Sequence, residues 1–341
     1  MTDRRSPFLE SARGDRQSRE HQRRVRRRRL VLLVVVVLAI VFGILAAKAG
    51  DALQGEPDGP DAAAASGAAT APPAVGQTAL GPIALRVDLG APDRFAVDFK
   101  RPPRAALVVD LDTGEVLWRR NAERALPIAS VTKMMTAIVA AEALGPRQRV
   151  RITPKILNYT GSGMGVLPRG KRVPVEPLLY GLLLPSGNDA ARALAIRTSG
   201  SLRGFVARMN AKAGELGLSC TRFASVEGLS PRNTSCPIDL AALARRVLDT
   251  PRLAAIVRRR KAILPFPIKG GKAYLYNHNP LLRTGYPGVI GVKTGYTSAA
   301  GRCLVAAVRR GGTRLGVVLL HSPDPGRQAE QLFDRAFRAL T

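Results

Sequence analysis

A serine and a lysine stand three positions apart at the start of a long apolar run. Ser130 and Lys133 frame the tetrapeptide Ser-Val-Thr-Lys, and Met134 to Leu144 follows with helical spacing and no Gly or Pro. Residues at positions i and i+3 of a helix are surface neighbours. A partly buried lysine amine loses proton affinity and can take the proton of an adjacent hydroxyl. The pair therefore indicates a nucleophile with its base; the plainer interpretation is an N-cap serine followed by a surface lysine.

Two further tripeptides lie at positions where their residue types are informative. Ser186-Gly187-Asn188 falls in the break between two apolar helical patterns, where an ordinary turn with an N-cap would look the same. Lys293-Thr294-Gly295 lies inside the strand pattern from Gly291 to Tyr296. A Lys and a Gly weaken such a strand unless something must approach its backbone closely. With ten lysines in the chain, Lys-Thr-Gly is expected about 0.05 times by chance.

These three motifs, in this order, resemble those of the serine D-alanyl-D-alanine carboxypeptidases, which are low-molecular-mass penicillin-binding proteins. The likeness spans roughly residues 100–340. The middle motif is Ser-Gly-Asn and not the Ser-Asp-Asn of many β-lactamases, which favours the carboxypeptidases. Other segments share the resemblance: Val109-Asp110, Thr113-Gly114, 129–136, 161–164, 184–191, 205–210, Gly228-Leu229 and 291–297.

The resemblance implies catalytic roles for four residues. Ser130 would be the acylated nucleophile and Lys133 its base. Ser186 would relay a proton to the leaving D-alanine, and Asn188 would hold the substrate amide and orient the lysine.

The same resemblance implies that four consecutive residues bind substrate. Lys293 and Thr294 would meet the terminal carboxylate, and Gly295 would let the strand backbone lie against the peptide. The backbone N–H groups of Tyr296 and Ser130 would form the oxyanion hole.

The implied activity is removal of the terminal D-alanine from peptidoglycan stem peptides, by an enzyme that also binds β-lactam antibiotics. A D,D-endopeptidase outcome stays open. A β-lactamase is disfavoured by Ser-Gly-Asn and by the absence of a Glu-x-x-Leu-Asn segment, so we expect a penicilloyl-enzyme to persist. A non-catalytic wall-binding domain is disfavoured because Ser130, Lys133, Asn188 and Lys293 are all intact. No cofactor or metal is expected, since the three histidines are scattered and lack ligand spacing.

The formal net charge of +28 limits the choice of partners. Such a charge can indicate nucleic acid binding. However, no basic stretch is interleaved with aromatic residues, which make up 5% of the chain, so no nucleic acid partner is expected. Attraction to an anionic membrane or wall polymer fits the charge equally well.

The N-terminal part divides into three segments before the catalytic domain. Residues 1–29 carry eleven Arg and form a basic cytoplasmic tail, and residues 30–47 are apolar and long enough for a transmembrane signal-anchor. Residues 48–81 form a flexible Ala/Pro/Gly linker, and 82–341 the catalytic domain, which would lie outside the cell membrane. The alternative is secretion after signal cleavage, for which Ala47-Lys48-Ala49 has suitable small residues.

Periodicity predicts an α+β fold: an antiparallel sheet flanked by helices, with an inserted all-helical lobe, as in the β-lactamases and DD-peptidases that the motifs resemble. A hairpin is expected at 105–110 and 115–118 around Asp112-Thr113-Gly114. Helices are expected at 134–144, 175–184, 189–198, 201–216, 238–248 and 326–340, and strands at 262–268, 291–296, 303–308 and 315–320. The sheet must then be assembled from both ends of the domain.

The three cysteines suit an exported protein only in part. Cys220 and Cys236 lie in one loop-rich segment and could pair, a question that the sequence leaves open. Cys303 falls in an apolar strand pattern and is expected to be a buried thiol.

Overall fold

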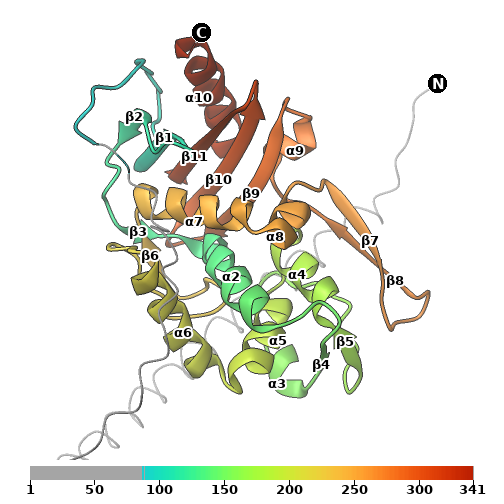
Figure 1. Cartoon of the computed structure of the whole chain (residues 1–341). Helices are drawn as coiled ribbons and strands as arrows, with labels where there is room; N and C mark the ends of the chain where they lie inside the picture. The colour runs from blue at the N-terminus through green and yellow to red at the C-terminus, as the bar shows by residue number, and fades with distance from the viewer. Residues whose placement is uncertain (1–86, 88, 341) are drawn as a thin grey trace, which may run out of the picture. The chain divides into compact units, whose positions relative to one another are not determined.

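A five-stranded antiparallel sheet forms the centre of the fold in the computed structural model, which describes residue 87 and residues 89–340 (Figure 1). Its strand order is β2-β1-β11-β10-β9, so the first two strands of the sequence join the last three. The bounds are Ala105–Asp110 for β1, Val116–Arg120 for β2, Val289–Thr297 for β9, Gly301–Arg310 for β10 and Thr313–Ser322 for β11. The predicted assembly of the sheet from both ends is confirmed.

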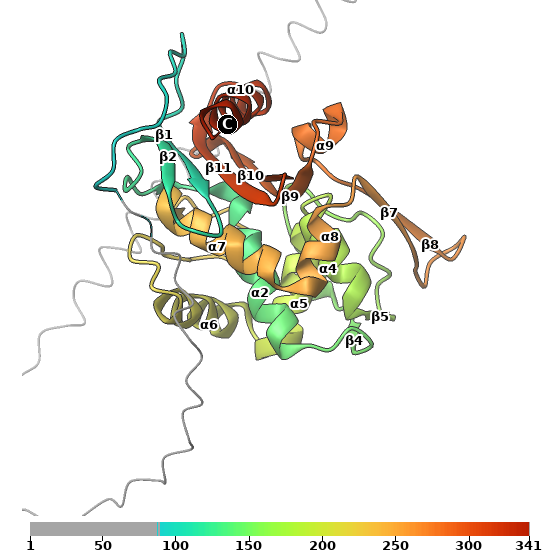
Figure 2. The same cartoon turned by 45° about the horizontal axis from the view of Figure 1, so that its top comes forward.

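Helices pack on both faces of this sheet, as a two-sided apolar sheet requires (Figure 2). Alternate residues of each strand face opposite sides: Ala106 and Val108 belong to the apolar cluster under α10 (Pro325–Ala339), whereas Leu107 and Val109 belong to the larger cluster shared with the other helices. On that second face, α7 (Pro237–Asp249) contacts β1, β9, β10 and β11. The site described below lies on the same side.

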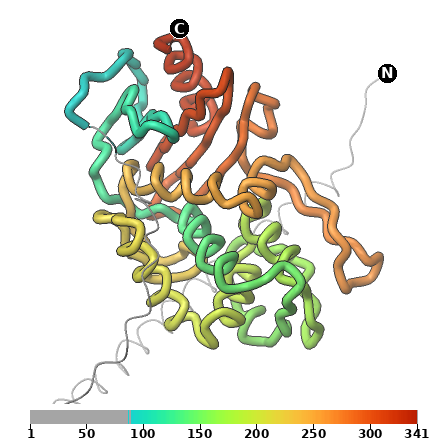
Figure 3. Tube along the Cα trace, in the orientation of Figure 1, coloured from blue at the N-terminus to red at the C-terminus, as the bar shows by residue number. Residues whose placement is uncertain are grey.

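The predicted helical lobe occupies the sequence between β2 and β9. Its helices are α2 (Lys133–Ala143), α3 (Pro154–Leu157), α4 (Val175–Leu183), α5 (Asn188–Ser199), α6 (Leu202–Glu215), α7 and α8 (Pro251–Val257). A short helix α9 (Pro280–Thr284) precedes β9. The fold class is therefore the predicted one, and the tube in Figure 3 shows how the chain leaves the sheet after β2 and returns to it at β9.

Six short strands lie outside the central sheet, in three two-stranded pairs. These are β3 (Leu126–Pro127) with β6 (Thr234–Ser235), β4 (Arg149–Arg151) with β5 (Arg172–Pro174), and β7 (Lys261–Pro265) with β8 (Lys272–Tyr276). The strand predicted at 262–268 is β7, which pairs only with β8 and leaves the sheet at five strands.

The plainer of the two interpretations of the Ser-Val-Thr-Lys tetrapeptide is wrong, because Ser130 is not the N-cap of a helix. It lies inside a 3-10 turn, η1 (Ala129–Thr132), and the α-helix begins only at Lys133. The backbone of Ala129 has a φ of 48°, so the chain turns sharply before the serine. The Ser130 hydroxyl is thereby free of a capping bond and available for other partners.

The N-terminal predictions fall on residues that the structure does not describe. The basic tail (1–29), the signal-anchor (30–47) and the linker (48–81) all lie outside the described residues. Within residues 89–340, no helix combines the length and apolar character that crossing a bilayer requires. The membrane predictions therefore stay predictions.

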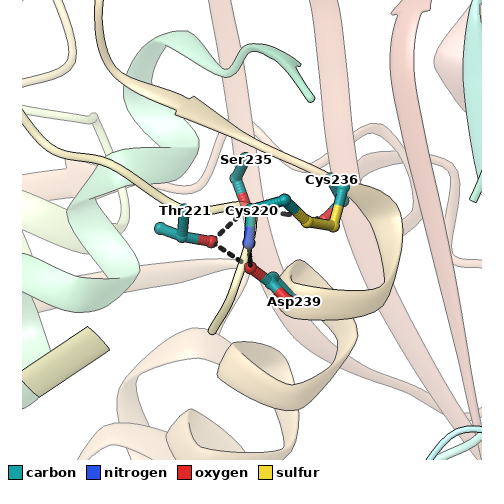
Figure 4. The surroundings of a disulfide bond; sticks show 5 residues. All are labelled: Cys220, Thr221, Ser235, Cys236 and Asp239. Carbon is teal, nitrogen blue, oxygen red and sulfur yellow. Dashed lines mark hydrogen bonds between the residues drawn. A yellow bond between two sulfur atoms is a disulfide. The ribbon is translucent and has the colours of Figure 1, made fainter. Parts of the chain in front are cut away.

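Cys220 and Cys236 form a disulfide, which settles the pairing that the sequence left open (Figure 4). Asp239 supports it from α7, because its Oδ2 accepts hydrogen bonds from the Cys220 N–H at 2.9 Å and from the Thr221 hydroxyl at 2.7 Å. Cys303 is a buried free thiol, as predicted, and burial raises its pKa to about 11.

Candidate active site

Ser130 and Lys133 meet at the junction of η1 and α2. The Lys133 Nζ lies 2.8 Å from the Ser130 Oγ. The lysine side chain is fully buried, whereas the serine is half-buried and remains accessible from the surface. The 3-10 turn directs the hydroxyl of residue 130 towards the amine of residue 133.

Two carbonyl oxygens complete the surroundings of the Lys133 amine. Its Nζ donates to the Asn188 Oδ1 and to the Glu227 backbone O, each at 2.7 Å. A neutral amine has two N–H bonds and one lone pair. The two carbonyl oxygens take both N–H bonds, so the lone pair is left for the Ser130 hydroxyl proton. This arrangement fits a base and not a surface lysine.

The electrostatics of the site favour the neutral amine. Burial lowers the pKa of Lys133 well below its ordinary value, and the nearby Lys293 lowers it further. Glu227 and Asp189 act in the opposite direction. A lysine whose pKa is depressed in this way can accept a proton near neutral pH.

The Ser186-Gly187-Asn188 motif occupies the break between α4 and α5. Asn188 is buried and bridges two segments, because its Nδ2 donates to the Thr160 O at 2.6 Å while its Oδ1 accepts from Lys133. Ser186 has a φ of 63°, and its buried hydroxyl has no hydrogen-bond partner within the described residues. A buried hydroxyl without a partner is costly and is typical of groups that bond to something absent from the resting protein.

The Lys-Thr-Gly motif lies on β9, the strand at the edge of the sheet that faces η1. Lys293 is buried, its Nζ donates to the Thr294 O at 2.9 Å, and burial lowers its pKa to about 7. Thr294 is half-buried. The Tyr296 side chain is 66% exposed and faces solvent. Both buried lysines of the domain therefore belong to the same region.

Gly295 has a structural role that the sequence did not reveal. A Cβ at this position would lie 2.8 Å from the Ile128 O and 3.0 Å from the Ser130 N. The expectation was a close approach by substrate, and the structure shows a close approach by the backbone of η1. Only glycine lets β9 lie against the turn that carries Ser130.

The sequence analysis assigned no role to residues 227 and 228, whose backbone contacts Lys133 and the turn that carries Ser130. Besides its carbonyl bond to Lys133, Glu227 forms an ion pair with Arg192 at 3.2 Å. Gly228 has a φ of 89°, and a Cβ there would lie 2.0 Å from the Ala129 O. The resemblance included Gly228-Leu229 without a role, and a backbone carbonyl has no signature in a sequence.

Asn233 fixes this segment to the turn that carries the serine. Its Nδ2 donates to the Thr132 Oγ1 at 2.9 Å and to the Ser225 O at 2.8 Å, and its Oδ1 accepts from two backbone N–H groups. The side chain is completely buried. One amide thus ties the 224–228 segment to η1.

Of the eight predicted site residues, three are joined directly by hydrogen bonds: Ser130, Lys133 and Asn188. Gly295 packs against the same turn, and Lys293 lies close enough to lower the pKa of Lys133. Ser186, Thr294 and Tyr296 make no hydrogen bond to the reacting pair among the described contacts. The individual catalytic and binding roles stay predictions.

Comparisons with known proteins agree with this geometry. The family model described as D-alanyl-D-alanine carboxypeptidase, peptidase S11, matches residues 99–324. The chain is 37% identical to D-alanyl-D-alanine carboxypeptidase DacB2 of Mycobacterium tuberculosis, over 69% of this chain and 82% of that relative. It is 35% identical to DacF of Bacillus subtilis, also over 69% of this chain, and spans 62% of the length of DacF.

Solved structures resemble the fold over a similar extent. A mutant of the Streptomyces K15 DD-transpeptidase superposes with a TM-score of 0.66 at 31% identity, covering 71% of this chain and 100% of that one. A D-alanyl-D-alanine carboxypeptidase from Mycobacterium tuberculosis gives a TM-score of 0.66 at 34% identity, covering 74% and 96%. At these identities the sequences resemble each other as well as the folds.

Proposed function

The chain belongs to the D-alanyl-D-alanine carboxypeptidase family, and from this premise we propose that it removes the terminal D-alanine of peptidoglycan stem peptides through an acyl-enzyme on Ser130. The observation that carries the proposal is the buried Lys133 amine, whose Nζ lies within hydrogen-bond distance of the Asn188 Oδ1, the Glu227 backbone O and the Ser130 Oγ. In the neutral amine the two carbonyl oxygens take the N–H bonds, and the lone pair is left for the serine hydroxyl 2.8 Å away.

In the acylation step, the Ser130 Oγ attacks the carbonyl carbon of the penultimate D-alanine while its proton passes to the Lys133 Nζ. The C–N bond of the tetrahedral intermediate then breaks, and the leaving D-alanine takes up that proton. The unpartnered hydroxyl of Ser186 is suited to relay it. Water later hydrolyses the ester, which restores the serine and releases the shortened peptide.

The terminal D-alanine of the substrate would bind on β9 through its carboxylate. The terminal carboxylate needs a cation and a hydrogen-bond donor, which Lys293 and Thr294 supply. The oxyanion would bind to the N–H groups of Ser130 and Tyr296, where losing one donor raises the barrier by about 2.7–4 kcal/mol. A bound carboxylate would also favour the ammonium form of Lys293.

A β-lactam carries the same carboxylate and a strained amide, so penicillin should acylate Ser130. We expect the penicilloyl-enzyme to persist. The same geometry also allows a D,D-endopeptidase, and one relative, 32% identical over 66% of this chain, is a D-alanyl-D-alanine endopeptidase of Pseudomonas aeruginosa.

The test is D-alanine release from a defined pentapeptide ending in D-Ala-D-Ala, together with labelling by fluorescent penicillin. We expect both for the wild type, neither for Ser130→Ala, and both for the control Ser219→Ala, which alters an exposed serine. Labelling of Ser130→Ala at the wild-type rate would refute the proposal. Rapid penicillin turnover would favour a β-lactamase, and faster cleavage of a cross-linked dimer than D-alanine release would favour an endopeptidase.

We also propose that residues 30–47 anchor the protein in the cell membrane, with residues 1–29 in the cytoplasm and the catalytic domain outside. The eighteen apolar residues and the adjacent arginines support this topology. Full-length protein should stay in the membrane fraction after alkaline washing, and external protease should degrade the catalytic domain of intact cells. A shorter form released into the medium would instead favour signal cleavage, and a protease-resistant domain would contradict the topology.

A further inference from the structure

A pocket lined by arginines lies beside β9, the strand on which the substrate is proposed to bind. We propose that this pocket binds a carboxylate on the stem peptide whose D-alanyl end is bound at Ser130. This inference rests on the proposed function and adds a second recognition point to it. The pocket has a volume of about 420 Å³ and is lined, among others, by Tyr296, Arg101, Arg104, Arg302 and His321. It lies where β9 ends and β10 begins, one residue beyond Lys-Thr-Gly.

The charges of this pocket are not compensated by the protein. Among residues 89–340, the Arg101 and Arg104 side chains form no hydrogen bond or ion pair, and the Arg302 Nη1 donates only to the Pro323 backbone O at 2.8 Å. No Asp or Glu lines the pocket. Three guanidinium groups without acidic partners repel one another, and an anion bound between them would relieve that repulsion.

Some arginines of the same domain bind carboxylates of the protein itself. Arg314, for example, binds Asp112 and Asp249 through charge-assisted hydrogen bonds. The guanidinium fork matches the two oxygens of a carboxylate, a contact that lysine cannot reproduce. The unpaired arginines beside Tyr296 are therefore suited to an external carboxylate.

The backbone of the pocket wall is held in an unusual conformation. His321 has a φ of 51°, a region that residues with a Cβ seldom adopt. A Cβ on Gly301, the first residue of β10, would lie 2.8 Å from the His321 Nδ1. The β10–β11 register is also irregular between Arg302 and Leu304. Strained backbone of this kind is concentrated at binding and catalytic sites, and here it shapes the wall of the arginine pocket.

The position of the pocket beside β9 indicates which molecule carries the bound carboxylate. Tyr296 belongs both to the pocket and to the strand on which the D-alanyl end is proposed to bind. A carboxylate that reaches the arginines is therefore carried by the same peptide. A separate polyanion, such as a polyol phosphate of the wall, would need no connection to β9.

The test uses two pentapeptides that both end in D-Ala-D-Ala and differ in one side chain, a carboxylate in one and a primary carboxamide in the other. For the wild type, kcat/KM for D-alanine release should be about tenfold higher with the carboxylate peptide. In the double variant Arg101→Gln and Arg104→Gln the ratio should fall to about one. Arg302→Gln should lower it partly, and the control Arg203→Gln, an exposed residue of α6, should leave it unchanged.

The same pair of peptides can be compared as inhibitors of penicillin labelling, which does not depend on D-alanine release. If neither peptide is hydrolysed but the carboxylate peptide inhibits labelling about tenfold better, the proposed function fails and the pocket assignment stands. A ratio of one in the wild type overturns the assignment, as does a ratio that the double variant keeps. Inhibition of labelling by a polyol phosphate, dependent on Arg101 and Arg104, without a peptide preference, would overturn the carboxylate as ligand.

Discussion

Replacing Asn188 with Asp tests whether Lys133 works as a neutral base. The Asn188 Oδ1 accepts from the Lys133 Nζ at 2.7 Å. A carboxylate in the same place keeps the shape but adds a negative charge beside the amine. The ammonium form becomes more stable, so the pKa of Lys133 rises.

The size of the effect follows from the distance. Two unit charges 2.7 Å apart attract by about 6 kcal/mol at an effective dielectric constant of about 20. The Asn188 oxygen already stabilises the ammonium by about 1.5–3 kcal/mol, and the substitution loses that contribution. A net effect of about 3 kcal/mol raises the pKa of Lys133 by about 2 units. Because only the neutral amine accepts the serine proton, acylation on the acidic limb should slow about a hundredfold.

The assay is the second-order rate constant for acylation by fluorescent penicillin, measured across pH. The acidic limb should move to higher pH in Asn188→Asp, and raising the pH should restore much of the lost rate. Asn210→Asp is the matched control, since Asn210 also bonds through both amide atoms, to the Phe223 backbone, and does not contact Lys133. A folded Asn188→Asp protein whose acidic limb stays in place would refute the neutral-base mechanism.

Three further expectations concern the surroundings of the site. Gly228→Ala puts a carbon 2.0 Å from the Ala129 O, so the rate of acylation by penicillin should fall at least about tenfold. The control Gly165→Ala, whose new carbon meets nothing within 4 Å, should keep the wild-type rate, and equal rates for the two variants would contradict the expected effect of Gly228. Removing the disulfide by Cys220→Ala and Cys236→Ala should lower the free energy of unfolding in urea by about 3 kcal/mol, because the loop spans 16 residues; an unchanged urea midpoint would disprove it. Lys293, with a pKa of about 7, is charged only below that pH, so KM for the pentapeptide should rise as the pH increases past 7; a flat KM would count against carboxylate binding by Lys293.

The parts of the fold that were predictable share one property, a pattern carried by side chains. Apolar periodicity over 175–184 predicted α4, and the alternation of short β-branched segments predicted β10 and β11. The motif around Lys293 stood out because a lysine inside a core-like strand needs an explanation. The structure supplies one, since that lysine lies near a second buried lysine.

The unpredicted parts depend on backbone atoms or on contacts between distant segments. The Glu227 carbonyl bonds to a lysine 94 positions away, and a main-chain oxygen looks the same at every residue. The 3-10 turn at Ser130 was also missed, because the sharp turn at Ala129 has no glycine to indicate it. The pairing of β7 was also not predicted, although its partner β8 is the next strand in the chain, because no strand was expected at Lys272–Tyr276.

The position of β11 in the sheet affects how the protein can fold during its synthesis. This strand lies between β1 and β10, yet the ribosome makes it after every other strand of the described domain. The opening hairpin must wait for more than half of the polypeptide before its neighbour exists, and long-range pairing of this kind is slow. A chain that cannot close its sheet until late in synthesis keeps an edge of β1 unpaired for longer, and exposed strand edges of this kind are prone to aggregate.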